Sequence, residues 1–441
     1  MRVSISVLAV MSAICVVSTP AFGESLQDAL ALAYQTNPTI RAERARLRAV
    51  RESRAQAWAG ALPQISAGGT IEKVDTSSTS SFGSNSNKLD SLGASVNAEQ
   101  PIFTGFRNLN AIKQAGARIR AGGAQLASAE QQVLLDVAGA YFNVQRNLAV
   151  FELNTQNVSV LVRQRDMAKA RFDVGEITRT DVAQAEARLA EARAQLSSAQ
   201  GNLAIARATY AQLVGQVPGD LDPVTELPNL PETLEAAQAV ADQYAPALIG
   251  AREQAEISRR QVNIARGAFL PSVSLTAGYQ YAEEPSFFVQ NSEEFRFGAR
   301  ASVPIFSGGL NFSKVREAKA LHAGDRSLLV GAERQVEAQT ISAWERLVTT
   351  RAIAKSAAAS VEANSLALKG VRAESMVGTR TTLDVLNAEQ EFLNAQVNLV
   401  SAQRDAQTAA FGLLAAIGML TPEAVGVSAE VEDGALSLYD E

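Results

Sequence analysis

Reactive side chains are scarce in this chain, and their scarcity limits the chemistry it can perform. Among 441 residues there is one cysteine, Cys15, and one histidine, His322. Cys15 lies in an apolar leader, so the mature chain would have no disulfide, no thiolate metal site and no thiol nucleophile. His322 falls in a helical pattern, where we expect a surface residue. The sequence also has no paired histidines, phosphate-binding glycine loop or catalytic triad pattern. We therefore predict a protein that is not an enzyme and needs no cofactor or metal.

The chain also lacks an excess of basic residues, and it has no long apolar run after the leader. The formal net charge is −6, which argues against an electrostatic interaction with nucleic acid. The leader combines Arg2, an apolar run over 3–17 and a small-x-small triplet at Ala21–Gly23. This pattern indicates a cleaved export signal over 1–23, with Glu24 as the first mature residue. The apolar run is too short to span a bilayer with confidence.

Aromatic residues and prolines are few, and this favours long helices. Aromatics make up 6% of the chain, whereas hydrophobic residues reach 47% and much of that is alanine. Ala-rich sequence studded with charges is typical of long helices that pack closely side by side. No proline interrupts Leu109 to Phe172. A helix of this length would extend about 100 Å.

The chain contains an internal duplication. "GALPQISAGGT" (60–70) and "AFLPSVSLTAG" (268–278) place their prolines 208 residues apart, and "EQPIFTGF" (99–106) and "SVPIFSGG" (302–309) place theirs 203 apart. "VGEITRTDV" (174–182) and "VGTRTTLDV" (377–385) keep the 203-residue spacing. A single slip of five residues accounts for both spacings, so we interpret the protein as two copies of one structural unit.

The duplication defines the predicted domain boundaries. The first repeat covers 24–217, with strands 63–78 and 88–103 and long helices 105–173 and 181–215. The second covers 232–420, with strands 271–282 and 294–306 and long helices 308–376 and 384–418. A linker occupies 218–231 and an acidic tail 421–441. We expect "STSSFGSNSN" and "AEEPSFFVQNSEE" to be loops, the second carrying Glu283, Glu284, Glu293 and Glu294 on an extracellular surface rather than binding metal.

Heptad seams follow each of the two repeated phrases. Apolar residues recur every seven positions, which is typical of left-handed supercoiling. In the first repeat the two seams are Val182, Leu189, Leu196, Leu203, Tyr210 and Ala185, Ala192, Ala199, Ala206, Leu213. In the second they are Val385, Phe392, Leu399, Ala406, Leu413 and Ala388, Ala395, Ala402, Ala409, Ala416. Periodicity alone is equally compatible with an ordinary coiled coil.

The predicted strands point to a membrane. "PSVSLTAGYQY" and "FRFGARASVPIF" alternate apolar with small or polar residues, and aromatics lie near their ends. Alternation over about ten residues is typical of outer-membrane barrel strands, although a soluble sandwich with one wet face would share it. Four strands cannot close a barrel, and open edges are not tolerated in lipid. We therefore predict a trimer that pools twelve strands.

The whole mature chain, from about 25 to 420, resembles the TolC-type outer-membrane channel-tunnels. The export signal, the "NP…LPQI" and "AP…LPSV" openings, both "PIF-[TS]-G" strand ends and above all "VGTRTTLDVLNAEQEFLNAQ" carry the resemblance. It implies a mixed α/β fold: a trimeric twelve-stranded barrel in the outer membrane of a Gram-negative bacterium, continued by a coiled-coil barrel across the periplasm. In each repeat the short helices (38–62 with 181–215, and 246–269 with 384–418) would stack end to end beside one long helix.

Residues of the repeated phrases would then lie at the periplasmic end. Gly175 and Gly378 would allow tight turns between helices, and Asp181 and Asp384 stand where an N-cap is expected. The resemblance implies that Asp384 lines the narrowest ring, where three chains bring three carboxylates around one axis. Asn387 replaces the family's second ring aspartate, so the ring should hold less negative charge.

The resemblance also implies a tether and docking partners. Arg380 would hold the closed inner coil to Asp181 and Gln164 on the outer pair. Ser375 replaces the family's tyrosine at a further link, so closure should depend on fewer links. A periplasmic membrane-fusion adaptor would dock on the two turns, at Val174, Gly175, Val377 and Gly378.

The implied function is a passive exit duct for efflux or type I protein secretion. The adaptor and an energised inner-membrane pump or ABC transporter would recruit it, and the cargo is left open. An alternative from the residues alone is a periplasmic coiled coil or adaptor without a pore, and a secreted hydrolase is a distant third.

Overall fold

The protein consists of two similar sets of helices and strands. The computed structural model describes residues 24–224, 229–286 and 289–426. The predicted export signal, 1–23, and most of the acidic tail, 421–441, lie outside the described residues. In chain order the elements are α1 (Leu26–Thr36), α2 (Pro38–Ala59), β1 (Gln64–Ser80), β2 (Gly83–Phe103), α3 (Arg107–Asp173), α4 (Arg179–Val214), α5 (Leu234–Tyr244), α6 (Pro246–Gly267), β3 (Ser272–Ser286), β4 (Val289–Ser302), α7 (Leu310–Met376), α8 (Thr382–Ala416) and a 3-10 turn, Glu423–Val425.

The predicted duplication is confirmed by the lengths of the helices. Helices α1 and α5 each have 11 residues, and α2 and α6 each have 22. Helices α3 and α7 each have 67 residues, while α4 and α8 have 36 and 35. At 1.5 Å per residue each long helix extends about 100 Å.

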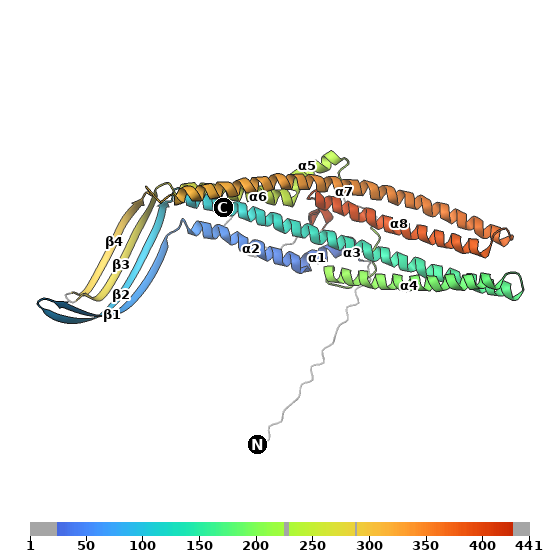
Figure 1. Ribbon diagram of the computed structural model, residues 1–441, viewed down its shortest axis with the longest axis horizontal. Coiled ribbons are helices and arrows are strands. Elements are labelled where there is room, and N and C mark those ends of the chain that lie inside the picture. Colours follow the sequence, from blue (N-terminus) through green and yellow to red (C-terminus); the bar gives the residue numbers. More distant parts are fainter. Residues whose placement is uncertain (1–23, 225–228, 287–288, 427–441) are drawn as a thin grey trace, which may run out of the picture.

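The helices of each repeat lie side by side along one long helix. Figure 1 shows α2 and then α4 following α3, and α6 and then α8 following α7. The end-to-end stacking expected from the resemblance is therefore confirmed. Pro38 and Pro246 begin α2 and α6 at the first helical position, where the missing N–H costs nothing. The turns α3–α4 and α7–α8 lie at the end of the molecule remote from the sheet.

The four strands form one antiparallel sheet in the order β1-β2-β3-β4. The pairing aligns Ala67, Val96, Tyr279 and Phe295 in one row across all four strands. Directly opposed residues share a face, so this face is apolar. Phe295 and Phe297 are each 74% exposed. The sheet therefore presents large apolar side chains outward, as predicted for a lipid-facing surface.

The strands extend through the segments that we expected to be loops. β1 continues to Ser80 and β2 begins at Gly83, while β3 continues to Ser286 and β4 begins at Val289. Two ion pairs between directly opposite residues stabilise the polar part of the β1–β2 pairing. They are Lys73–Asp90 at 3.2 Å and Lys88–Asp75 at 3.4 Å. The prediction was wrong here because backbone pairing continues where the side chains become polar.

The loop predicted to carry four glutamates was also wrong. These residues lie in β3 and β4: Glu283, Glu284, Glu293 and Glu294. Glu294 pairs with Arg296 on the same strand. β4 ends at Ser302 and not at 306. The proline at 304 has no N–H to offer a neighbouring strand, which accounts for the earlier end.

The main core lies midway along the helices, where α1 and α5 cover the long helices (Figure 1). Tyr141 and Phe142 of α3, Tyr210 of α4 and Phe411 of α8 are its largest buried side chains. The Phe142 and Phe411 rings meet edge to face with centroids 5.6 Å apart. This core joins the two repeats. Among the described helices, none combines the length and the apolar content that crossing a membrane would require.

Candidate functional site

The two turns at the far end close two helical hairpins. We call α3 and α4, with the turn 174–178, the first hairpin, and α7 and α8, with the turn 377–381, the second hairpin. The predicted seams lie inside them: most of the Ala and Leu seam positions in α4 and α8 are buried, including Leu189, Leu203 and Leu413. Small alanines on alternate turns allow the paired helices to approach closely.

Glycine makes both turns possible. Gly175 and Gly378 have φ angles of +81° and +84°, a region in which an L side chain is strained. The Gly175 N–H donates to the Phe172 carbonyl at 2.9 Å, and the Gly378 N–H donates to the Ser375 carbonyl at 3.2 Å. The roles predicted for these glycines as turn residues are therefore confirmed by the backbone.

Threonines, and not aspartates, cap α4 and α8. Thr178 and Thr381 are the N-cap residues, and Asp181 and Asp384 lie three positions later. Each aspartate N–H donates to the threonine hydroxyl, at 3.4 Å and 3.2 Å, and each carboxylate accepts from the threonine N–H at 2.9 Å. The predicted N-cap positions were wrong because this capping box satisfies two main-chain donors with a reciprocal pair.

The caps hold both carboxylates in the charged form. Hydrogen bonds from the side chain and then the backbone of Thr178 keep the pKa of Asp181 below its usual range. For Asp384 the backbone bond from Thr381 contributes most to lowering its pKa, and the Thr381 side chain and Arg380 add to it. At neutral pH each hairpin tip therefore carries a fixed negative charge.

Arg380 binds within its own turn. Its Nε donates to Oε2 of Glu374 at 2.7 Å, an exposed pair that joins the end of α7 to the turn. Among the described residues no hydrogen bond connects Arg380 to Asp181 or Gln164 within one chain. A tether of Arg380 to those two residues thus stays a prediction for contacts between chains.

An apolar contact joins the two hairpins near their tips. Leu386 of α8 is 2% exposed and packs into a cluster formed by the first hairpin. The other buried members of this cluster are Leu161, Ala168, Ala185, Leu189 and Ala192. The second hairpin therefore inserts a leucine between the helices of the first. Sequence reasoning missed Leu386, although an apolar residue next to the seam residue Val385 was a signal for a second contact face.

A hydrogen bond lies beside this cluster. Nη2 of Arg188 in α4 donates to Oδ1 of Asn387 in α8 at 3.1 Å. Asn387, expected in a ring around the threefold axis, here faces the first hairpin of its own chain. Arg188 was not among the predicted site residues. It lies one heptad after Asp181, and so on the same face of α4.

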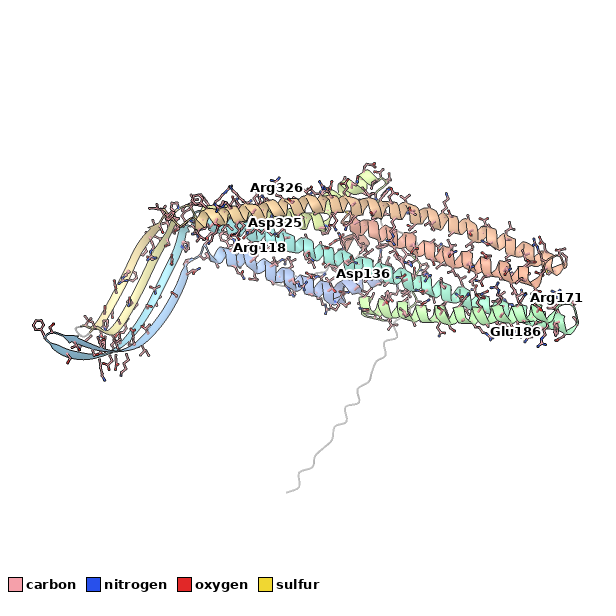
Figure 2. All side chains as sticks on the ribbon, in the orientation of Figure 1. Arg118, Asp136, Arg171, Glu186, Asp325 and Arg326 are labelled. Carbon is pink, nitrogen blue, oxygen red and sulfur yellow. The ribbon has the colours of Figure 1, made fainter. Side chains whose placement is uncertain are left out.

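Each hairpin has internal ion pairs near its tip. In the first, Lys169 Nζ lies 2.8 Å from Glu186 Oε1, and Arg171 pairs with Glu176 at 2.9 Å; Figure 2 labels Arg171 and Glu186 there. In the second, Arg372 binds the carboxylate of Glu389, which is only 6% exposed. These bonds hold each hairpin together as a unit, whereas Arg188–Asn387 joins one hairpin to the other.

The tips expose apolar residues. Val174 is 72% exposed and Val377 is 76% exposed, and neither Gly175 nor Gly378 would bring a Cβ within 4 Å of another atom. The tip surface formed by these four residues is therefore open in the single chain.

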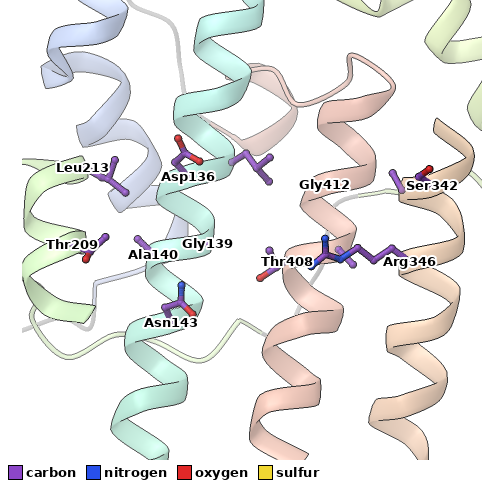
Figure 3. A pocket seen from close by; sticks show the side chains of 13 residues that line it. Asp136, Gly139, Ala140, Asn143, Thr209, Leu213, Ser342, Arg346, Thr408 and Gly412 are labelled. Carbon is purple, nitrogen blue, oxygen red and sulfur yellow. The ribbon is translucent and has the colours of Figure 1, made fainter. Parts of the chain in front are cut away.

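A hollow of about 650 Å³ lies away from the tips, between α3, α4, α7 and α8 (Figure 3). Small residues such as Gly139 and Gly412 leave the space, and Asp136 and Arg346 supply its charges. No histidine or cysteine is among its lining residues. The hollow therefore offers neither an imidazole base for its hydroxyl groups nor a thiol nucleophile. His322, expected on the surface, is partly buried and its Nδ1 lies 3.0 Å from Oγ of Ser258.

Comparison with known proteins gives consistent matches along the chain. Residues 29–216 and 238–419 both match the family model described as "Outer membrane efflux protein". The outer membrane efflux protein BepC of Brucella suis is 31% identical over 408 residues, covering 92% of this chain and 88% of BepC. The outer membrane protein TolC of Vibrio cholerae is 27% identical, covering 95% of this chain and 96% of the relative.

Solved structures share the fold. The crystal structure of CusC superimposes with a TM-score of 0.80 over 90% of this chain and 92% of that chain, at 19% sequence identity. At this identity the likeness establishes the arrangement of strands and helices alone.

Proposed function

The chain belongs to the outer membrane efflux protein family, whose members are non-enzymatic outer-membrane efflux and secretion channels, and from this we propose that it is a passive duct closed by the second hairpin. The leucine contact between the two hairpins is the observation that carries the proposal. Leu386 is held by apolar packing against α3 and α4, with one exposed hydrogen bond beside it. A contact of this kind can be broken and remade without unfolding either hairpin.

The sheet supports a trimeric assembly. Strands β1 and β4 are each hydrogen-bonded on one side only within the described chain, and unpaired edges are costly in lipid. Three copies would pair these edges and close a twelve-stranded barrel in the outer membrane. The helices that continue from the strands would then surround one axis and form the tunnel in the periplasm.

In this proposal the second hairpin is the gate, and it moves between a closed and an open position. In the closed state Leu386 and Asn387 keep α8 against the first hairpin, and Asp384 of three chains faces the axis. Within each chain the hydrogen bonds from Thr381 lower the pKa of Asp384 and favour its charged form. In the open state α7 and α8 move together, because the Arg372–Glu389 pair keeps them joined.

The tip surface supports docking of a second protein. Val174 and Val377 are exposed apolar residues on adjacent hairpins, and exposed apolar residues at a protein's end often mark a binding surface. We assign this surface to a periplasmic membrane-fusion adaptor that recruits an inner-membrane pump or ABC transporter. Energy for transport would come from that transporter.

Conductance in planar bilayers tests the duct and its gate together. The purified wild-type protein should give small, stable current steps. Leu386→Ala should give larger or longer openings, since removing a buried leucine side chain costs about 2–5 kcal/mol of packing. Leu368→Ala removes a buried leucine of α7 that belongs to neither the main core nor the Leu386 cluster and should leave the current steps unchanged. Absence of any conductance from a properly inserted protein would support the periplasmic coiled coil instead.

A further inference from the structure

Glu24, the first residue after the predicted cleavage point, is held by its main chain. Its N–H donates to the Asp220 carbonyl at 2.8 Å, and its carbonyl accepts from the Asp222 N–H at 3.1 Å. These bonds form a parallel bridge between Glu24 and Leu221. The residue in front of α1 is therefore joined to the segment that follows α4.

The side chain of Glu24 is held as firmly. Its Oε1 accepts from the Tyr210 hydroxyl at 2.5 Å and from Nε2 of Gln216 at 3.1 Å. Its Oε2 accepts from the Gly219 N–H at 3.2 Å. Donors on both oxygens fix the orientation of a carboxylate, so Glu24 has one defined position.

Two of the partners of Glu24 belong to the core. Tyr141 and Tyr210 are both 0% exposed, and the Tyr141 hydroxyl lies 2.8 Å from the Glu24 carbonyl oxygen and 2.7 Å from that of Asp222. The hydroxyl has one proton and donates to one of these carbonyls at a time. Burial raises the pKa of both tyrosines far above the usual range, so both remain neutral donors.

The surroundings of Glu24 carry negative charge. Asp28 and Asp222, together with Glu24, act electrostatically on Tyr141, and Asp220 supplies the carbonyl that binds the Glu24 N–H. Within the described chain none of these four acidic side chains forms a salt bridge with lysine or arginine. A cation at the nitrogen of Glu24 would offset this charge.

We propose that Glu24, Tyr141, Tyr210 and the segment 216–222 form a capture site for the mature N-terminus, completed by removal of the export signal. A signal peptidase would hydrolyse the bond before Glu24 with one water molecule. Gly23 leaves as a carboxylate, and the nitrogen of Glu24 takes up protons to become an ammonium group. One neutral donor thereby becomes three donors with a positive charge, beside the three acidic residues that act electrostatically on Tyr141. Export processing thus strengthens the junction of α1, α3 and α4.

The first test measures how accessible the N-terminal amine is in the assembled, detergent-solubilised protein. The probe is 2-pyridinecarboxaldehyde, which reacts with N-terminal amines, and the product is quantified by mass spectrometry. We expect labelling of the native protein to be much slower than labelling of the denatured chain. Tyr210→Phe removes one hydroxyl from the carboxylate and should speed labelling on the order of tenfold. Tyr244→Phe, at an exposed tyrosine, should not. Equal rates in native and denatured protein, or no effect of Tyr210→Phe, overturn the proposal.

The second test keeps every side chain and displaces only the charge. Inserting Ala-Ser between Gly23 and Glu24 leaves a processed chain that begins two residues earlier, which the intact mass verifies. Glu24 then keeps a neutral peptide N–H. We expect the new amine to label freely and the unfolding midpoint to fall below that of the wild type. A protected amine or an unchanged midpoint contradicts the proposal. Conductance should be unaffected in either case, so this test is independent of the duct function.

Discussion

Arg188 and Asn387 form a hydrogen bond of 3.1 Å between α4 and α8, although 199 residues separate them in the chain. The bond lies next to Leu386, which is buried in the first hairpin. Because the bond is exposed and its acceptor is neutral, we expect it to contribute modestly, about 0.5–1.5 kcal/mol. That amount is enough to shift an opening equilibrium without fixing the hairpin permanently.

Arg188→Ala should therefore increase channel opening several-fold. Loss of about 1 kcal/mol from the closed state raises the open population by about fivefold. Single-channel recording of open probability measures the effect. Arg193→Ala removes an exposed arginine of the same helix and serves as the matched control. If both variants opened equally, the bond to Asn387 would have no specific role in closure.

Asp384→Ala should relieve block of the pore by divalent cations, because three carboxylates would be removed from one ring. The substitution also removes the capping box with Thr381, which could alter the turn. Thr381→Val removes the hydroxyl from the same box, keeps the Asp384 carboxylate and controls for that loss. Block is measured as the cation concentration that halves the current. Equal relief in both variants would assign the effect to the caps.

The same aspartate predicts a pH dependence. The pKa of Asp384 lies below its usual value, so its carboxylate is charged at neutral pH and is protonated only as the pH falls through the lowered folded value. The cap contribution to stability is therefore present above the unfolded pKa and is lost in acid. Cation block should persist from pH 7 to pH 5 and weaken only in more acidic solution. Block that fades between pH 7 and pH 5 would contradict this assignment.

Arg380→Ala should loosen closure if Arg380 reaches a neighbouring chain in the trimer. Within one chain it binds Glu374, so the substitution could also act by freeing the turn. Glu374→Gln separates the two effects, since it weakens the turn and leaves the guanidinium free for another partner. Higher conductance in Arg380→Ala alone supports the tether. The same increase in Glu374→Gln would place the effect within the turn, and unchanged conductance in both would refute any role of Arg380 in closure.

Val377→Glu should weaken adaptor docking, because it puts a charge on an exposed apolar tip residue. Leu328→Glu places the same charge at a residue of similar exposure, 69% against 76%, in α7 far from the tips. Site-specific crosslinking at 377–381, followed by recovery of the adaptor, gives the measurement. A loss of crosslinked adaptor in both variants would mean that the charge acts without regard to position.

Local sequence patterns predicted much of the fold. The duplication, the seams and the glycine turns could be predicted because each depends on residues close in sequence or repeated at fixed spacing. Gly175 and Gly378 needed only the reversal between two helical patterns. The lengths of the helices followed from the absence of proline. The caps were misplaced by three residues because Thr178 and Asp181 hydrogen-bond to each other, and only one of the two can occupy the N-cap.

The contact between the hairpins could not be predicted from the sequence. Arg188, Leu386 and Asn387 meet because the core at Phe142 and Phe411 fixes how the two repeats lie against each other. The extent of the strands depended on register in the same way: Lys73 supports β1 because Asp90 is directly opposite. Pairings of this kind are tertiary: Leu386 beside Val385 could mark a second contact face, but no local pattern identifies the residues that it meets.

Replacing equivalent glycines of the two repeats with alanine should reduce the free energy of unfolding by different amounts. Gly215 and Gly418 follow α4 and α8 with φ angles of +94° and +81°. At Gly215 a Cβ would meet only Oγ1 of Thr36, at 3.6 Å, whereas at Gly418 it would lie 2.2 Å from the carbonyl oxygen of Tyr244.

Gly215→Ala should therefore cost about 1–2 kcal/mol of unfolding free energy, the strain of a left-handed residue with a side chain. Gly418→Ala should cost more, because the backbone between α5 and α6 must also move to relieve the contact. Urea unfolding of the two variants at one protein concentration compares them, and Gly331→Ala, a helical position with nothing within 4 Å of a new Cβ, should be neutral or slightly stabilising. Equal losses at Gly215 and Gly418 would mean that the close approach of Tyr244 to the end of α8 contributes nothing to holding α5 and α6 against α8.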